Sequence, residues 1–157
     1  MSDIQPSRPG LSTTVLLIDA FEDDRQYWVH RLHISAPDYV VLEADTGAAG
    51  LALCESHPVH CVALELNLPD MPGFEVLIKL VPRPLHPQIA VIVLSRVEHL
   101  SIAELAEDNG AQAFLFKSHT SGDQLITAID RAIARVGSTT KEQVDAAGGR
   151  SIRVRRS

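Results

Sequence analysis

One stretch decides the fold of this chain: Cys61-Val62-Ala63-Leu64-Glu65-Leu66-Asn67-Leu68-Pro69-Asp70-Met71-Pro72-Gly73. It is an apolar run that carries one carboxylate, on Glu65, and then breaks into a loop containing proline and glycine. Such a pattern predicts a buried strand followed by a turn. Because parallel strands deliver their last side chains to a functional edge of the sheet, Glu65 is the first candidate site residue.

Four further apolar runs surround this one, at residues 14–19, 39–44, 88–95 and 111–117. Continuous apolar runs indicate strands that are buried on both faces. Helices are predicted over residues 22–33, 46–56, 74–80, 101–110 and 121–136, with Thr46 as a cap and capping boxes at Ser101–Glu104 and Ser121–Gln124. Five strand–helix units in alternation predict an α/β fold, a doubly wound parallel sheet with five helices.

Polar side chains stand at the ends of four of these strands: Asp19, Glu65, Ser95 and Lys117. Right-handed crossovers place the carboxyl ends of parallel strands at one edge of the sheet. We therefore expect two carboxylates, a hydroxyl and an ammonium group to meet there. This combination predicts a site for a phosphoryl group or a cation.

The composition predicts one cytoplasmic domain with short extensions. The chain has 157 residues, of which 45% are apolar, and no run of the roughly 18 apolar residues that a membrane helix needs. A net charge of −6 argues against nucleic acid as the domain's partner. We predict a disordered arm over residues 1–12, a folded domain over 13–136, and a flexible tail over 137–157 that carries five basic and two acidic side chains.

Residues 13–136 resemble the receiver domain of two-component response regulators. The resemblance is carried by residues 15–19, 64–73, 91–95 and 110–117, above all by Leu-Pro-Asp-Met-Pro-Gly at 68–73. It implies a flavodoxin-like fold with strand order 2-1-3-4-5. In that family an aspartate that ends the third strand accepts phosphate from a histidine kinase. Two acidic residues after the first strand, together with a backbone carbonyl, hold a divalent metal, usually magnesium.

Carried over by position, the resemblance makes Glu65 the equivalent of the phosphoacceptor. Ser95 and Lys117 take the positions that bind phosphoryl oxygens, and Phe114 takes that of the aromatic residue that moves inward with the Ser/Thr group. Asp19, Glu65 and the Asn67 carbonyl take those of the metal ligands, but Ala20 replaces an acid. Ser118 stands where the family usually has a proline after the lysine, often preceded by a cis bond.

Ala20 and Glu65 both depart from the chemistry of the family. Ala20 removes an oxygen donor and a negative charge, so we expect a weak or absent magnesium site and no resident cofactor. The extra methylene of Glu65 moves its carboxylate toward the place of a phosphoryl group and spoils the placement that in-line transfer needs. Glu65 either mimics the phosphorylated state by accepting hydrogen bonds from Ser95 and Lys117, or simply pairs with Lys117 in an inert scaffold.

The sequence therefore predicts an atypical receiver, a protein-interaction module rather than an enzyme. Its expected partner is a histidine kinase, another receiver or a downstream signalling protein; a homodimer is also compatible, and neither nucleic acid nor membrane is expected to bind the domain. One alternative is a conventional magnesium-dependent phosphoacceptor. Another is a flavodoxin-like flavin-binding protein or enzyme.

A second group of reactive side chains has the spacing of soft-metal ligands: Cys54, His57, His60 and Cys61. These residues fall at the sheet edge opposite Glu65. The competing interpretation, which we prefer, makes Cys61 a core residue and leaves the histidines exposed.

Overall fold

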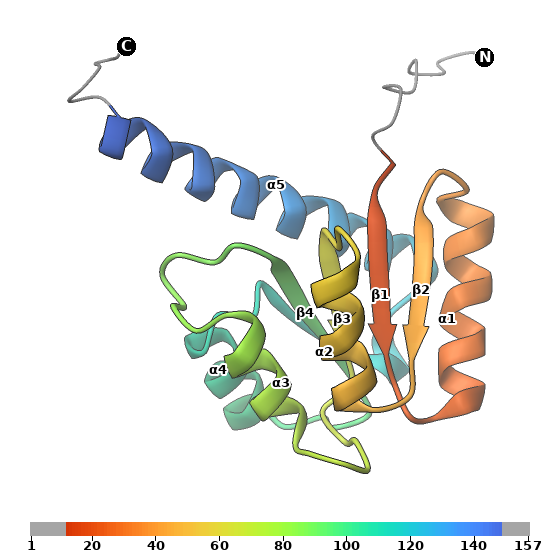
Figure 1. The fold of residues 1–157 in the computed structure, drawn as a ribbon. Coiled ribbons are helices and arrows are strands. Elements are labelled where there is room, and N and C mark those ends of the chain that lie inside the picture. The colour runs from red at the N-terminus through yellow and green to blue at the C-terminus, as the bar shows by residue number, and fades with distance from the viewer. Residues whose placement is uncertain (1–11, 149–157) are drawn as a thin grey trace.

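A computed structural model describes the backbone of residues 12–148 and the side chains of residues 12–137. Its five strands form one parallel sheet in the order β2-β1-β3-β4-β5, which confirms the predicted fold (Figure 1). In chain order the elements are β1 (Thr14–Ile18), α1 (Glu22–Ser35), β2 (Val40–Ala44), α2 (Gly47–Ser56), β3 (Cys61–Leu64), α3 (Gly73–Leu80), β4 (Ala90–Ser95), α4 (Leu100–Asp108), β5 (Ala113–Phe116), a 3₁₀ turn (Lys117–His119) and α5 (Gly122–Gly148).

The sheet is covered by helices on both faces, because alternate residues of each strand point to opposite sides. On one face, residues such as Leu17 and Ile92 pack against α1 and α5, with Leu32 and Ile129 buried between the layers. On the other face, α2, α3 and α4 cover a second core that includes Leu64. Every residue of β1, β3 and β4 is buried, as continuous apolar runs require.

Two of the three predicted helix caps are confirmed. The Thr46 hydroxyl accepts a hydrogen bond from the Ala49 N–H at 3.0 Å. Ser121 and Gln124 form a reciprocal capping box, in which the Gln124 N–H donates to the Ser121 hydroxyl and the Ser121 N–H donates to the Gln124 amide oxygen.

The capping box predicted at Ser101 is wrong. Helix α4 begins at Leu100, with His99 as its N-cap, because the His99 carbonyl already accepts hydrogen bonds from Ile102 and Ala103. Ser101 therefore lies inside the first turn, and its hydroxyl contacts His99 Nδ1 at 2.8 Å.

The predicted end of the last helix at residue 136 is also wrong. Helix α5 has 27 residues and continues to Gly148, so most of the predicted flexible tail is helical. An isolated glycine such as Gly137 costs a helix about 1 kcal/mol and does not end it by itself. The predicted arm up to residue 11, and the tail from residue 149, lie outside the described residues. Among the described residues, no helix is both long and apolar enough to cross a membrane.

Strand register brings the polar strand ends to one level. Ile18 pairs with Leu64, and Leu64 with Val93, so Asp19 and Glu65 leave the sheet side by side. On the other side of β4, Ser95 pairs with Phe116, which immediately precedes Lys117.

Candidate functional site

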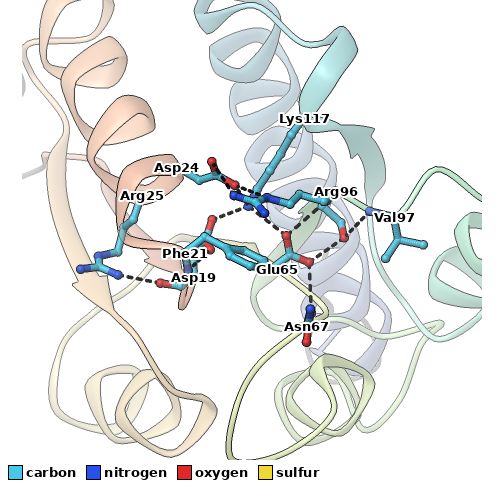
Figure 2. Close-up of polar contacts among 10 residues, drawn as sticks. Asp19, Phe21, Asp24, Arg25, Glu65, Asn67, Arg96, Val97 and Lys117 are labelled. Carbon is cyan, nitrogen blue, oxygen red and sulfur yellow. Dashed lines mark hydrogen bonds and ion pairs between the residues drawn. The ribbon is translucent and has the colours of Figure 1, made fainter.

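Glu65 lies at the centre of the strand-end site, and its carboxylate is fully engaged. One oxygen, Oε2, accepts from the Ser95 hydroxyl at 2.6 Å and from the Asn67 N–H at 3.0 Å. The other, Oε1, accepts from the Arg96 N–H at 3.2 Å and pairs with Lys117 Nζ at 2.9 Å (Figure 2). The residue is 1% exposed, and four donors approach the number that a buried carboxylate can accept.

Lys117 connects three carboxylates. Its Nζ lies 2.7 Å from Asp19 Oδ2, 2.8 Å from Asp24 Oδ2 and 2.9 Å from Glu65 Oε1, and the side chain is 8% exposed. An ammonium group has three donors, so all of them are used here. Burial of the ammonium group acts to lower the pKa of Lys117, but the hydrogen bonds to the three carboxylates outweigh it and raise that pKa.

The two aspartates around Lys117 have different electrostatic surroundings. Burial raises the pKa of Asp19, although hydrogen bonds from Lys117 and from the Phe21 N–H act against it. Asp24 lies nearer to solvent, and the hydrogen bond from Arg96, together with that from Lys117, lowers its pKa. Of the two aspartates, Asp24 is therefore the one held more firmly in its charged form.

Ser95 links Glu65 to the loop between β4 and α4 through hydrogen bonds. Its buried hydroxyl donates to Glu65 and accepts from the Val97 N–H at 3.1 Å. The next N–H, that of Arg96, also donates to Glu65. Phe114, the predicted switch aromatic, is partly buried against the core on the α3 and α4 side.

The residues present do not fit a divalent cation. Magnesium needs oxygen donors around it, and Ala20 offers no side-chain oxygen. The carboxylate oxygens of Asp19, Asp24 and Glu65 are already bonded to nitrogen or hydroxyl donors. At Asn67 it is the N–H that faces Glu65. Over residues 12–137, whose side chains are described, no three His, Cys, Asp or Glu side chains are grouped to hold a metal ion.

Sequence reasoning placed Asp19, Glu65, Ser95 and Lys117 together, and the structure brings all four into contact. It missed Arg96 and Phe21. Arg96 directly follows a strand-end residue, which was the available signal. In the described part of the chain no cis peptide bond occurs, and Ser118 lies in the 3₁₀ turn after β5.

Comparison with known families decides what kind of domain carries this site. The model of the response regulator receiver domain matches residues 15–130. The chain belongs to the response regulator receiver domain family. This membership places it in two-component signalling and favours that assignment over the flavodoxin-like flavin-binding alternative.

The relatives of this chain include a response regulator and a transcriptional regulatory protein. The chain is 36% identical over 122 residues to the nitrate/nitrite response regulator protein NarL of Escherichia coli, a match that covers 77% of this chain and 55% of NarL. It is 33% identical over 123 residues to the transcriptional regulatory protein KdpE of Mycobacterium tuberculosis, covering 78% of this chain and 52% of KdpE. The chain thus spans about half the length of these relatives.

Solved structures agree with the receiver fold. A response regulator receiver domain from Clostridium thermocellum has a TM-score of 0.67 at 27% identity, covering 78% of this chain and 95% of that one. A CheY-like receiver domain protein from Methanospirillum hungatei has a TM-score of 0.68 at 23% identity, covering 84% and 99%.

Proposed function

We propose that this receiver is a protein-interaction module that signals without phosphoryl transfer, with the Glu65 carboxylate standing in for a phosphoryl group. The observation that carries this proposal is the 2.6 Å hydrogen bond from the Ser95 hydroxyl to a Glu65 carboxylate that is 1% exposed. Glu65 thereby holds the side chain that the family uses to sense phosphorylation.

The donors around Glu65 support mimicry over a simple ion pair. Ser95 and Lys117 occupy the positions that bind phosphoryl oxygens in the family, and both bond to Glu65. The N–H groups of Asn67 and Arg96 add two donors from the flanking loops. A carboxylate carries one negative charge where a phosphate carries about −1.5 to −2, so the mimicry is partial.

The same contacts oppose a role for Glu65 as a phosphoacceptor. An attacking oxygen must approach phosphorus in line, and small errors of placement are costly. Both oxygens of Glu65 are instead held by donors within the protein. A metal ion would normally neutralise the developing charge of such a transfer, and the donor set for one does not fit here.

We place the protein partner on the face formed by α4, β5 and α5, the usual output face of the family. Leu100 and Leu105 of α4 are exposed, by 74% and 48%. The partner is a histidine kinase, another receiver (including a second copy of this chain) or a downstream signalling protein.

The first experiment tests phosphorylation of the wild-type chain. We expect no gain of a phosphoryl group, by intact mass, after incubation with Mg²⁺ and phosphoramidate. A conventional receiver that carries aspartate at the acceptor position serves as the positive control. A stoichiometric phosphoryl group on Glu65 would contradict the proposal and establish the conventional phosphoacceptor.

The second experiment separates mimicry from inert scaffold. In Glu65→Gln, we expect hydrogen exchange at the Arg96 and Val97 amides to become about ten-fold faster or more, because hydrogen bonds to a charged group contribute about 1.5–3 kcal/mol. The matched control is Glu75→Gln, an exposed glutamate paired with Lys79, which should leave these amides unchanged. Equal exchange in both variants would show that the charge of Glu65 does not hold the loop.

A further inference from the structure

Arg96 lies on the solvent side of the Glu65 pocket, by which we mean the group formed by Asp19, Glu65, Ser95 and Lys117. It follows Ser95 at the end of β4, and its side chain is 55% exposed, yet it is fixed by two contacts. The guanidinium group donates to Asp24 through Nε at 2.8 Å and through Nη2 at 3.3 Å. Its central carbon lies 3.7 Å from the centroid of the Phe21 ring. Asp24 lies in the first turn of α1 and Phe21 is the N-cap of that helix, so Arg96 joins the loop after β4 to the start of α1 (Figure 2).

Lys117 lies beneath Arg96 and shares its partners. Its Nζ is 2.8 Å from Asp24 Oδ2, the oxygen that Arg96 Nε also contacts, and 5.0 Å from the Phe21 ring centroid. The carboxylates of Asp19, Asp24 and Glu65 are therefore paired with two cationic side chains, which are Arg96 and Lys117. These carboxylates stand at the strand edge where a receiver would hold its divalent metal.

We propose that Arg96 is a clamp that closes this pocket and, with Lys117, supplies from the protein the positive charge that a divalent metal would otherwise bring. The clamp consists of Arg96, Asp24 and Phe21. It excludes divalent cations by electrostatic repulsion and covers the approach of a small phosphodonor to position 65. This inference rests on the proposed function, since it explains how the Glu65 pocket is kept closed without phosphorylation.

Charge and geometry support the clamp together. A guanidinium group fits a carboxylate through two parallel hydrogen bonds and also stacks on aromatic rings, so one side chain satisfies both partners. A divalent cation placed among the three carboxylates would lie close to both Arg96 and Lys117. At such short separation the repulsion between cations is large even at the effective dielectric constant of a protein surface.

The test restores the chemistry of a metal-binding receiver and then removes the clamp. The starting protein is the full chain with Ala20→Asp and Glu65→Asp, and the probe is Mn²⁺, titrated by isothermal calorimetry. Adding Arg96→Ala should tighten Mn²⁺ binding by about ten-fold or more, because a nearby positive charge is removed. The charge-matched control is Arg83→Ala in the same background, since Arg83 is exposed before β4, at the other edge of the sheet. It should change the affinity by less than about two-fold, because distant surface charges are screened by salt.

A second readout concerns access to position 65. With Mg²⁺ and phosphoramidate, the Ala20→Asp/Glu65→Asp chain should be labelled more slowly, by intact mass, than the same chain with Arg96→Ala. Circular dichroism and thermal melting confirm that each variant is folded. If Arg96→Ala changes neither Mn²⁺ affinity nor labelling, or changes them no more than Arg83→Ala, the clamp is refuted.

The clamp and the proposed function can fail separately. Phosphorylation of the wild-type chain on Glu65 would refute the proposed function, whatever Arg96 does. Unchanged Mn²⁺ affinity after Arg96→Ala would refute the clamp alone, even if the wild-type chain takes up no phosphoryl group.

Discussion

The two edges of the sheet carry comparable sets of reactive side chains, and only one set is assembled. At the carboxyl edge, Asp19, Glu65, Ser95 and Lys117 come from four different strand ends and form one connected network. Every link in it involves a group that is largely removed from water. A change at one member must therefore alter the others.

At the amino edge, the candidate soft-metal ligands each have a separate role. Cys61 is completely buried in the core, where burial raises the pKa of its thiol. His60 Nδ1 accepts from the Thr14 N–H at 3.0 Å, and His57 Nδ1 contacts the neighbouring Ser56 hydroxyl. Burial also raises the pKa of the Cys54 thiol, to about 11. Close spacing in the sequence did not bring these four together, whereas convergence of parallel strands joined residues that are far apart in the chain.

The largest expected effect of breaking the carboxyl-edge network comes from Lys117→Met. The variant leaves the buried carboxylates of Asp19 and Glu65 without their cation, and loss of one partner from a buried ion pair costs about 3–5 kcal/mol. Urea unfolding of the purified chain measures this loss. Lys79→Met is the matched control, because Lys79 pairs with Glu75 on the surface of α3 and such pairs contribute about 0.3–0.5 kcal/mol. Similar losses in the two variants would show that the network is no more than a set of surface pairs.

The pH dependence of that difference tests the electrostatics of Lys117. Its pKa is raised in the folded chain, so its contribution is fully present below the unfolded pKa of about 10.4 and is lost as the pH rises through the higher folded value. We expect the stability gap between wild type and Lys117→Met to stay constant from neutral pH to about pH 10 and to shrink above it. A gap that closes already near pH 8 would mean that burial lowers this pKa instead.

The smallest effect is expected at the amino edge, from Tyr39→Phe. The Tyr39 hydroxyl donates to Asp130 of α5, and loss of one such hydrogen bond costs about 0.5–1.5 kcal/mol. Because this pair is separate from the Glu65 network, its cost should add to that of Lys117→Met within about 0.5 kcal/mol. Unfolding of the double variant measures the sum. A larger deviation would mean that the two edges are coupled through the sheet.

The sequence allowed the sheet and four site residues to be predicted because both signals are local. Continuous apolar runs identify buried parallel strands, and the polar residue that ends each run, such as Glu65 or Lys117, must then lie at the shared edge. The helix starts at Thr46 and Ser121 were equally local, since each cap lies within one turn of its partner.

Elements whose ends depend on distant contacts were predicted less well. Ser101 matched a capping box, but the path of the loop after β4 made His99 the first acceptor of the helix. The end of α5 was placed twelve residues early, at 136 rather than Gly148. No pattern within these two segments alone specifies where α4 begins or where α5 ends.

The sequence by itself determined the receiver fold and the departures at Ala20 and Glu65 from the family's metal and acceptor positions. Only the tertiary structure decided that Arg96 reaches across to Asp24 and Phe21, and that Lys117 binds three carboxylates at once. Each strand end follows from an apolar run that lies within one segment of the chain. The direction of a long charged side chain is chosen instead by the charges and rings that other segments bring near it.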